Sequence, residues 1–137
     1  MSRPDPFSFS DCPIANVLDC VGDKWSLLIL RDLLFFGKQS FSALQNSDER
    51  MATNILSSRL EKRENDGLIT RQADPGDKRK KVYTLTQAGK DRLPIMLEMI
   101  AWSSQYDPDT NAPRPLVKRI KTNRENLIRD LLNRVES

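Results

Sequence analysis

Two short runs with strand character, separated by a Pro-Gly turn, interrupt a chain whose pattern is otherwise helical. The runs are LITRQA and KKVYTLT, and Asp74-Pro75-Gly76-Asp77 stands between them. Proline fixes φ at the first central position of a turn, and glycine tolerates positive φ at the second. The stretch therefore predicts an antiparallel hairpin closed by a type II turn.

Apolar residues at helical spacing, bounded by caps and glycines, predict helices on both sides of this hairpin. The expected helices cover about 13–21, 24–36, a short stretch from Ser40 or Ser42, 53–65, 87–106 and 116–135. Thr53 is a suitable N-cap for the helix before the hairpin, and Gly67 is suited to end it. Thr86 should cap the helix after the hairpin, and Pro94 should bend that helix.

Three or four helices, a hairpin and further helix form the order of a winged helix-turn-helix. The predicted fold is mainly α with a small β-hairpin wing and additional C-terminal helices. We expect a flexible N-terminal arm at 1–11, a DNA-binding domain at 12–106 and a C-terminal helix at 114–137. Dimerisation through that last helix is a further hypothesis.

The charge distribution points to a polyanionic partner. The net charge is only +3, but residues 51–92 hold ten basic and six acidic residues, which leaves +4 in that segment. Four consecutive cations, Lys78–Lys81, follow the turn and repel one another unless an anion meets them. In a wing, that anion would be DNA phosphate. A solvated hairpin tip is the simpler explanation of the same run.

The expected outer face of the 53–65 helix carries short polar side chains, which suit close approach to a surface. The helix before a wing lies in the DNA major groove. The candidate DNA-binding residues are Thr53, Asn54, Ser57, Ser58, Arg59, Lys62, Lys78, Arg79, Lys80 and Lys81. Ordinary surface exposure is the alternative for the serines and Asn54, and a role within the fold is the alternative for Arg59.

Residue types that are missing exclude much chemistry. The chain has no histidine, two cysteines and no glycine-rich phosphate loop, so we expect neither an enzyme, a metal site nor a bound cofactor. No apolar run approaches the roughly 20 residues of a membrane span. The expected location is the cytoplasm. A winged-helix protein-interaction module that does not bind DNA is the alternative function.

Several motifs together resemble the HxlR-type regulators, which are bacterial relatives of the MarR group. The resemblance extends from about Cys12 to Trp102. The matching motifs are Cys12-Pro13, Gly22-x-Lys24-Trp25, Phe41-x-x-Leu44, Leu56-Ser57-x-Arg59-Leu60 and Tyr83-x-Leu85-Thr86-x-x-Gly89. The family usually places an apolar residue where Arg63 stands, and its domain usually ends soon after the position of Trp102.

A two-fold dimer on a palindromic operator is expected, because one recognition helix reads few bases. The first helix and the apolar stripe from Leu116 to Val135 are the predicted dimer seam. Trp25 is expected in the core, and Met96, Met99 and Trp102 in a core or seam. A small-molecule pocket beside those three is a less favoured alternative.

Cys12 is the candidate redox sensor. Unpaired N–H groups at a helix N-terminus favour an anion, and therefore a reactive thiolate, at this position. Some HxlR-type regulators sense oxidants or electrophiles at the Cys-Pro position, so the resemblance implies an oxidant effector. A helix cap that senses nothing is the alternative. Cys20 is expected to be an inert core residue.

Overall fold

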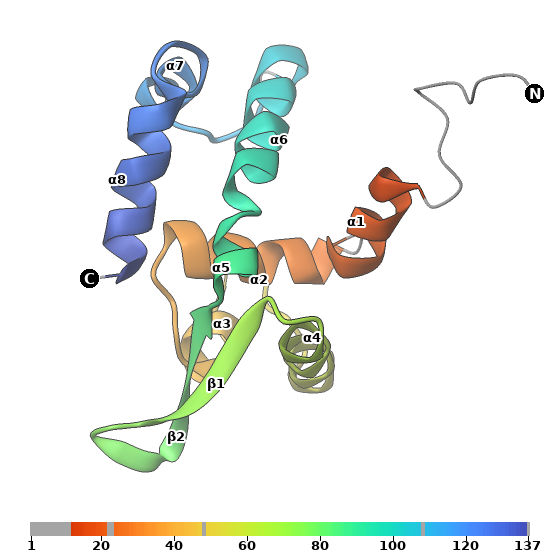
Figure 1. Cartoon of the computed structure of the whole chain (residues 1–137), viewed down its shortest axis with the longest axis vertical. Helices are drawn as coiled ribbons and strands as arrows, with labels where there is room; N and C mark the ends of the chain where they lie inside the picture. The colour runs from red at the N-terminus through yellow and green to blue at the C-terminus, as the bar shows by residue number, and fades with distance from the viewer. Residues whose placement is uncertain (1–11, 22–23, 48, 108, 137) are drawn as a thin grey trace, which may run out of the picture.

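The computed structural model describes residues 12–21, 24–47, 49–107 and 109–136. The expected arm at 1–11 lies outside these ranges. The elements are α1 (Pro13–Val21), α2 (Lys24–Phe35), α3 (Phe41–Gln45), α4 (Thr53–Asn65), β1 (Ile69–Asp74), β2 (Asp77–Leu85), α5 (Gln87–Lys90), α6 (Leu93–Tyr106), α7 (Arg114–Thr122) and α8 (Arg124–Glu136). This order confirms the predicted winged helix-turn-helix with additional C-terminal helices (Figure 1).

Helix α2 is the centre of the packing. Its apolar residues Ile29, Leu30, Leu33 and Leu34 are all buried, as the sequence predicts. The helix contacts α1, α4, β2 and α8, so the N-terminal helix, the helix before the hairpin, the hairpin and the C-terminal helix share one core. Trp25 is half-buried and packs against that core, in agreement with its expected place.

Two carboxylates fix the turn between α3 and α4 to α2. Arg31 donates to both carboxylate oxygens of Glu49, at 2.5 and 2.9 Å. The buried Asp32 carboxylate accepts from Arg31 at 2.9 Å and from the Ser47 hydroxyl. The hydrogen bonds from Arg31 lower the pKa of Glu49 from its ordinary 4.5 to about 2. This network sets where α4 begins.

The hairpin is antiparallel, but its turn differs from the prediction. Gly76 is absent from the described residues with positive φ, so the type II turn is wrong. The Asp74 carboxylate accepts from the Gly76 N–H at 2.8 Å instead, which holds the turn in another conformation. Ala73 pairs with Lys81 while Asp74 pairs with Asp77. Residues 78–80 therefore form a bulge at the tip.

The expected single helix over 87–106 is two helices. Thr86 caps α5 by accepting from the Gly89 N–H at 3.2 Å, as predicted. A Cβ on Gly89 would lie 2.2 Å from the Leu68 carbonyl oxygen, so only glycine fits this crossing. The chain breaks at Asp91–Arg92, and Pro94 stands in the first turn of α6, where its missing N–H costs nothing. Pro94 therefore helps to start a helix, which corrects the expected bend.

The predicted C-terminal helix is likewise divided. Helix α7 ends before Asn123, whose φ of −152° and ψ of 51° are not helical, and α8 begins at Arg124. Ile120, Leu127 and Leu131 of the predicted stripe are buried in the core of the same chain, and α8 packs on α2. Those three side chains are therefore covered within their own chain, whereas Leu116 and Val135 of the stripe are only partly buried, and a dimer seam at the C-terminal segment stays a prediction.

We predict that Glu49→Gln lowers the free energy of unfolding by about 1–2 kcal/mol at pH 7, because a charge-assisted pair is lost. Since the folded pKa is about 2 and the ordinary value is 4.5, the contribution of Glu49 is complete above pH 4.5. This contribution to the free energy of unfolding is lost as the pH falls from 4.5 through 2. Urea unfolding of both proteins at pH 7 and pH 3 should show that the difference between their free energies of unfolding is smaller at pH 3.

The matched control is Glu61→Gln, which changes an exposed carboxylate on α4. This control should stay within about 0.5 kcal/mol of the natural protein at pH 7. Equal losses for the two variants would show that the Arg31–Glu49 contact does not stabilise the turn.

Candidate nucleic-acid interface

Helix α4 divides cleanly into an inner and an outer face. Leu56, Leu60 and Arg63 are buried, whereas the candidate residues Thr53, Asn54, Ser57, Ser58 and Lys62 are exposed. The N-cap is Ala52, and not Thr53 as expected. Thr53 is the first helical residue, and its hydroxyl accepts from the Gln45 side chain at 2.5 Å. That bond ties α4 to α3 and aims the outer face away from the core.

The cations of α4 differ in their exposure and in their contacts within the chain. Arg59 is half-buried and engaged within the chain, and Lys62 lies 3.5 Å from the Asp66 carboxylate. Arg63 is 0% exposed, and its only described ion pair is with Asp66 at 3.3 Å. Arg63 thus fills the apolar position at which the sequence departs from the HxlR pattern, and its guanidinium makes no described hydrogen bond.

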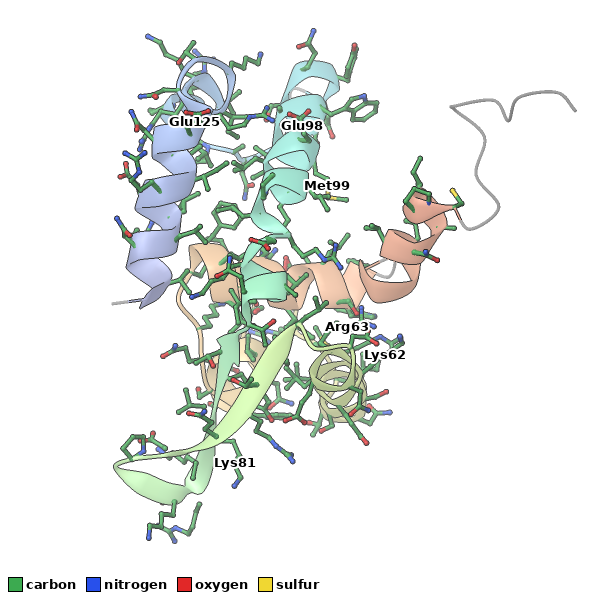
Figure 2. All side chains as sticks on the ribbon, viewed as in Figure 1. Lys62, Arg63, Lys81, Glu98, Met99 and Glu125 are labelled. Atoms are coloured by element: carbon green, nitrogen blue, oxygen red, sulfur yellow. The ribbon has the colours of Figure 1, made fainter. Side chains whose placement is uncertain are left out.

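The wing carries its positive charge at the tip. Lys78, Arg79, Lys80 and Lys81 are all exposed, and the hairpin extends away from the helices (Figures 1 and 2). Asp77 approaches Arg79 at 3.4 Å, but the Arg79 side chain is 92% exposed, so this pair contributes little. Helix α4 and the tip lie toward the same end of the molecule (Figure 1).

Two glutamates restrict which part of α4 can approach DNA. Glu61 and Glu64, from the C-terminal half of α4, line a hollow of about 320 Å³ against the hairpin. Arg71 of β1 lies 3.9 Å from Glu64 in the same hollow. The acidic side chains would repel phosphate there. Ser57 also lines this hollow, whereas Asn54 does not, so Asn54 in the uncharged N-terminal half is the side chain best suited to base edges.

Two cations beside α4 are missing from the sequence-derived candidates. Arg50 is exposed, has φ of 47° and immediately precedes the turn into α4. Arg71 is exposed on β1, next to α4. Neither belongs to a run of charges or a helical face, so no sequence pattern separates them from other surface arginines.

An apolar groove runs between α1 and α6, away from the wing. Pro13, Ile14, Val17, Leu18, Leu27, Ile95 and Met99 line about 490 Å³ of it. Figure 2 shows Met99 on the side of α6 nearer to α1. Met99 is 47% and Trp102 68% exposed, so neither is a core residue, whereas Met96 is buried as predicted. Trp102 stacks on Tyr106 with ring centroids 5.0 Å apart.

Cys12 occupies the expected place at the start of α1. Its carbonyl accepts from the Asn16 N–H at 3.0 Å, Pro13 is the first helical residue, and the Cys12 side chain is half-buried. The side chain of Cys20 lies outside the described part of the structure. Within the described ranges, there is no cluster of three or more side chains suited to hold a metal ion. The helices in those ranges include none that is long and apolar enough to span a membrane.

A helix with a polar outer face, followed by a hairpin with a cationic tip, defines a winged helix-turn-helix DNA-binding protein. The chain belongs to the HxlR-like helix-turn-helix family, whose model matches residues 20–111. It is 31% identical over 98 residues to the HTH-type transcriptional regulator YdeP of Bacillus subtilis. That match covers 72% of this chain and 76% of YdeP.

Solved structures agree with this assignment. The reduced form of the transcriptional regulator YodB from B. subtilis superposes with a TM-score of 0.60 at 26% identity. The match covers 73% of this chain and 99% of YodB. The redox regulator HypR in its oxidised form gives 0.58 at 28% identity, over 69% of this chain and 96% of HypR. The protein is a DNA-binding transcriptional regulator.

Proposed function

We propose that two copies of this chain bind a palindromic operator, with α4 in the major groove and the wing on the flanking backbone or minor groove. The observation that carries the proposal is the position of the polar N-terminal half of α4 and the basic tip at one end of the molecule (Figure 1). A protein-interaction module is not favoured, because the relatives are helix-turn-helix transcriptional regulators.

The two elements have different tasks in this proposal. Lys78, Arg79, Lys80 and Lys81 neutralise phosphates, which position the protein but carry no sequence code. Thr53, Asn54, Ser57 and Ser58 approach base edges or the adjoining backbone. Arg59 and Lys62 lie beside that face and supply further phosphate contacts. Arg50 is exposed just before α4 and would add a further phosphate contact, whereas Arg71 lies beside Glu64 and is not assigned to DNA.

We predict that replacing Lys78–Lys81 by alanine weakens binding to operator and random DNA about equally. Each lost phosphate contact should reduce the log–log salt slope by about 0.9. Replacing Asn54 by alanine should instead reduce discrimination between operator and random DNA by about 1–3 kcal/mol. Operator fragments selected from genomic DNA, followed by titration across a salt series, would measure both effects.

Lys118→Ala/Lys121→Ala is the matched control, because it removes two exposed cations at the opposite end of the chain. Its DNA affinity and salt slope should equal those of the natural protein. A wing variant that keeps the full DNA affinity and salt slope would show that the tip does not contact DNA. If Asn54→Ala weakens binding to operator and random DNA equally, Asn54 contacts the DNA backbone and not a base.

The proposed dimer forms through the α1–α6 groove. Ile14, Leu18 and Trp102 are more than half exposed, and together with Met99 they form an apolar surface that a monomer would leave in water. A second copy related by a two-fold axis would cover it and place the two α4 helices on successive half-sites. The buried residues of the C-terminal stripe take no part, since they close the core of their own chain.

We predict that Leu18→Glu combined with Met99→Glu converts the dimer into a monomer, because two charges would be buried in the seam. Sedimentation equilibrium across a concentration series would show the change in mass. Phe36→Glu is the control, since Phe36 is 58% exposed but does not line the groove. A double variant that remains dimeric while staying folded would place the seam elsewhere.

Oxidant control through Cys12 is the second part of the proposal. The half-buried thiol begins α1, and α1 borders the proposed seam. The similar regulator HypR is described as a redox regulator, and YodB has been solved in reduced and diamide-treated forms. A disulfide between the two Cys12 side chains, or one with a small thiol, would shift α1 and hence the spacing of the recognition helices. The alternative remains a cap that senses nothing.

We predict that diamide changes the operator affinity of the natural protein at least several-fold and leaves Cys12→Ser unchanged. Formation of a disulfide removes two electrons and two protons from the thiols, and diamide accepts them. Cys20 is present in both proteins and therefore serves as the internal control. Equal responses of the two proteins, or no response of either, would show that Cys12 is not the switch. Mass spectrometry would identify the bond formed.

A further inference from the structure

The molecule has a second basic surface, at the end opposite to the wing (Figure 1). The end of α6, the loop that follows and α7 enclose a hollow of about 490 Å³. The polar residues that line it are Ser104, Asp107, Thr110, Arg114, Lys118 and Lys121. Helix α7, which supplies all three cations of the hollow, lies beyond the residues 20–111 matched by the family model, whereas Ser104, Asp107 and Thr110 lie within them.

Three cations converge on the hollow without partners of their own. Arg114, Lys118 and Lys121 recur at helical spacing on one face of α7, and all are exposed. In the part of the chain that the structure describes, none of the three forms an ion pair. Two nearby arginines do form ion pairs: Arg119 with Asp130 at 2.7 Å, and Arg124 with Glu98.

One carboxylate, Asp107, opposes the three cations. Its Oδ1 accepts from the Asp109 N–H at 3.0 Å, which directs part of its charge to the loop backbone. With three positive charges and one negative charge among the lining side chains, the hollow keeps a net positive charge. The unpaired cations repel one another unless an anion joins them.

Ser104 lines the hollow and has an unpartnered hydroxyl just beneath its wall. Its hydroxyl oxygen is buried and has no hydrogen-bond partner among the described residues. Thr110 differs, because its hydroxyl donates to the Asp107 carbonyl at 3.3 Å. A buried hydroxyl without a partner is unfavourable. Because this oxygen is shielded from solvent, the Ser104 side chain must rotate before it can donate to a ligand in the hollow.

We propose that this hollow binds a small, multiply charged anion that carries a phosphoryl group. The guanidinium of Arg114 matches phosphate oxygens in a two-bond arrangement, the lysines supply charge, and the Ser104 hydroxyl donates to a further oxygen. A small ligand fits better than a nucleic-acid backbone, because the three cations gather around one hollow of about 490 Å³. Binding would join α6 to α7 beside the proposed dimer seam, a place suited to regulation.

Isothermal titration with inorganic pyrophosphate, at constant ionic strength set with NaCl, tests the site directly. We expect saturable binding of one pyrophosphate per chain by the natural protein. Lys118→Ala/Lys121→Ala should weaken binding at least tenfold. Ser104→Ala keeps every charge and should weaken binding about 2- to 10-fold, the worth of one hydrogen bond. Alanine replacement of Lys78–Lys81 should leave binding unchanged.

Thermal unfolding without pyrophosphate separates these effects from misfolding. Ser104→Ala loses no internal bond and should melt with the natural protein, as should the double lysine variant. The proposal is overturned if the natural protein shows no saturable binding, or if both pocket variants bind as tightly as it does. Loss of binding in the wing variant alone would place the anion on the wing. Duplex DNA binding that depends on Lys118 and Lys121 would identify a second nucleic-acid surface instead.

Discussion

Burial of α2 is the constraint on which the other elements depend. Helix α2 carries the apolar side chains of Ile29, Leu30 and Leu33, and exposing them to water would be unfavourable. These side chains are buried because α1, α4, β2 and α8 together cover the helix. Because these four elements use the same apolar surface, the recognition helix and the C-terminal helices are parts of one packing unit. The Asp32 and Arg31 contacts with Ser47 and Glu49 then fix the turn that leads into α4.

The distribution of charge follows the long axis of the molecule. The wing tip and the unpaired face of α7 are both positive and lie at opposite ends, whereas the α1–α6 groove between them is apolar (Figures 1 and 2). A net charge of +3 conceals this arrangement. In the proposed arrangement, one end would bind DNA, the middle a second copy and the far end a small anion, so all three could be occupied together.

Prediction from the sequence succeeded where a local pattern and the packing agree. The outer face of α4 follows from the positions of Leu56 and Leu60, and Gly67 ends the helix with φ of 78°. It failed at the turn, because the Asp74 carboxylate accepts from the Gly76 N–H two residues on, a local alternative that the Pro-Gly pair does not reveal. It also could not show that α1 and α6 border one apolar groove, because that depends on contacts between distant residues. Arg50 and Arg71 have no sequence signal at all.

The sequence by itself determined the winged-helix order, the polar face before the wing and the cationic tip, because these depend on spacing along the chain. It also placed Gly89 in a family motif, but only the structure shows that a Cβ there would meet the Leu68 carbonyl oxygen. Only the tertiary structure decided which apolar stripe stays exposed. Both α1 and the C-terminal segment are amphipathic, and the contact of α8 with α2 buries Leu127 and Leu131 while Ile14 and Leu18 remain in solvent. An amphipathic sequence shows that the apolar face of a helix must be covered, but only the three-dimensional packing shows which element covers it.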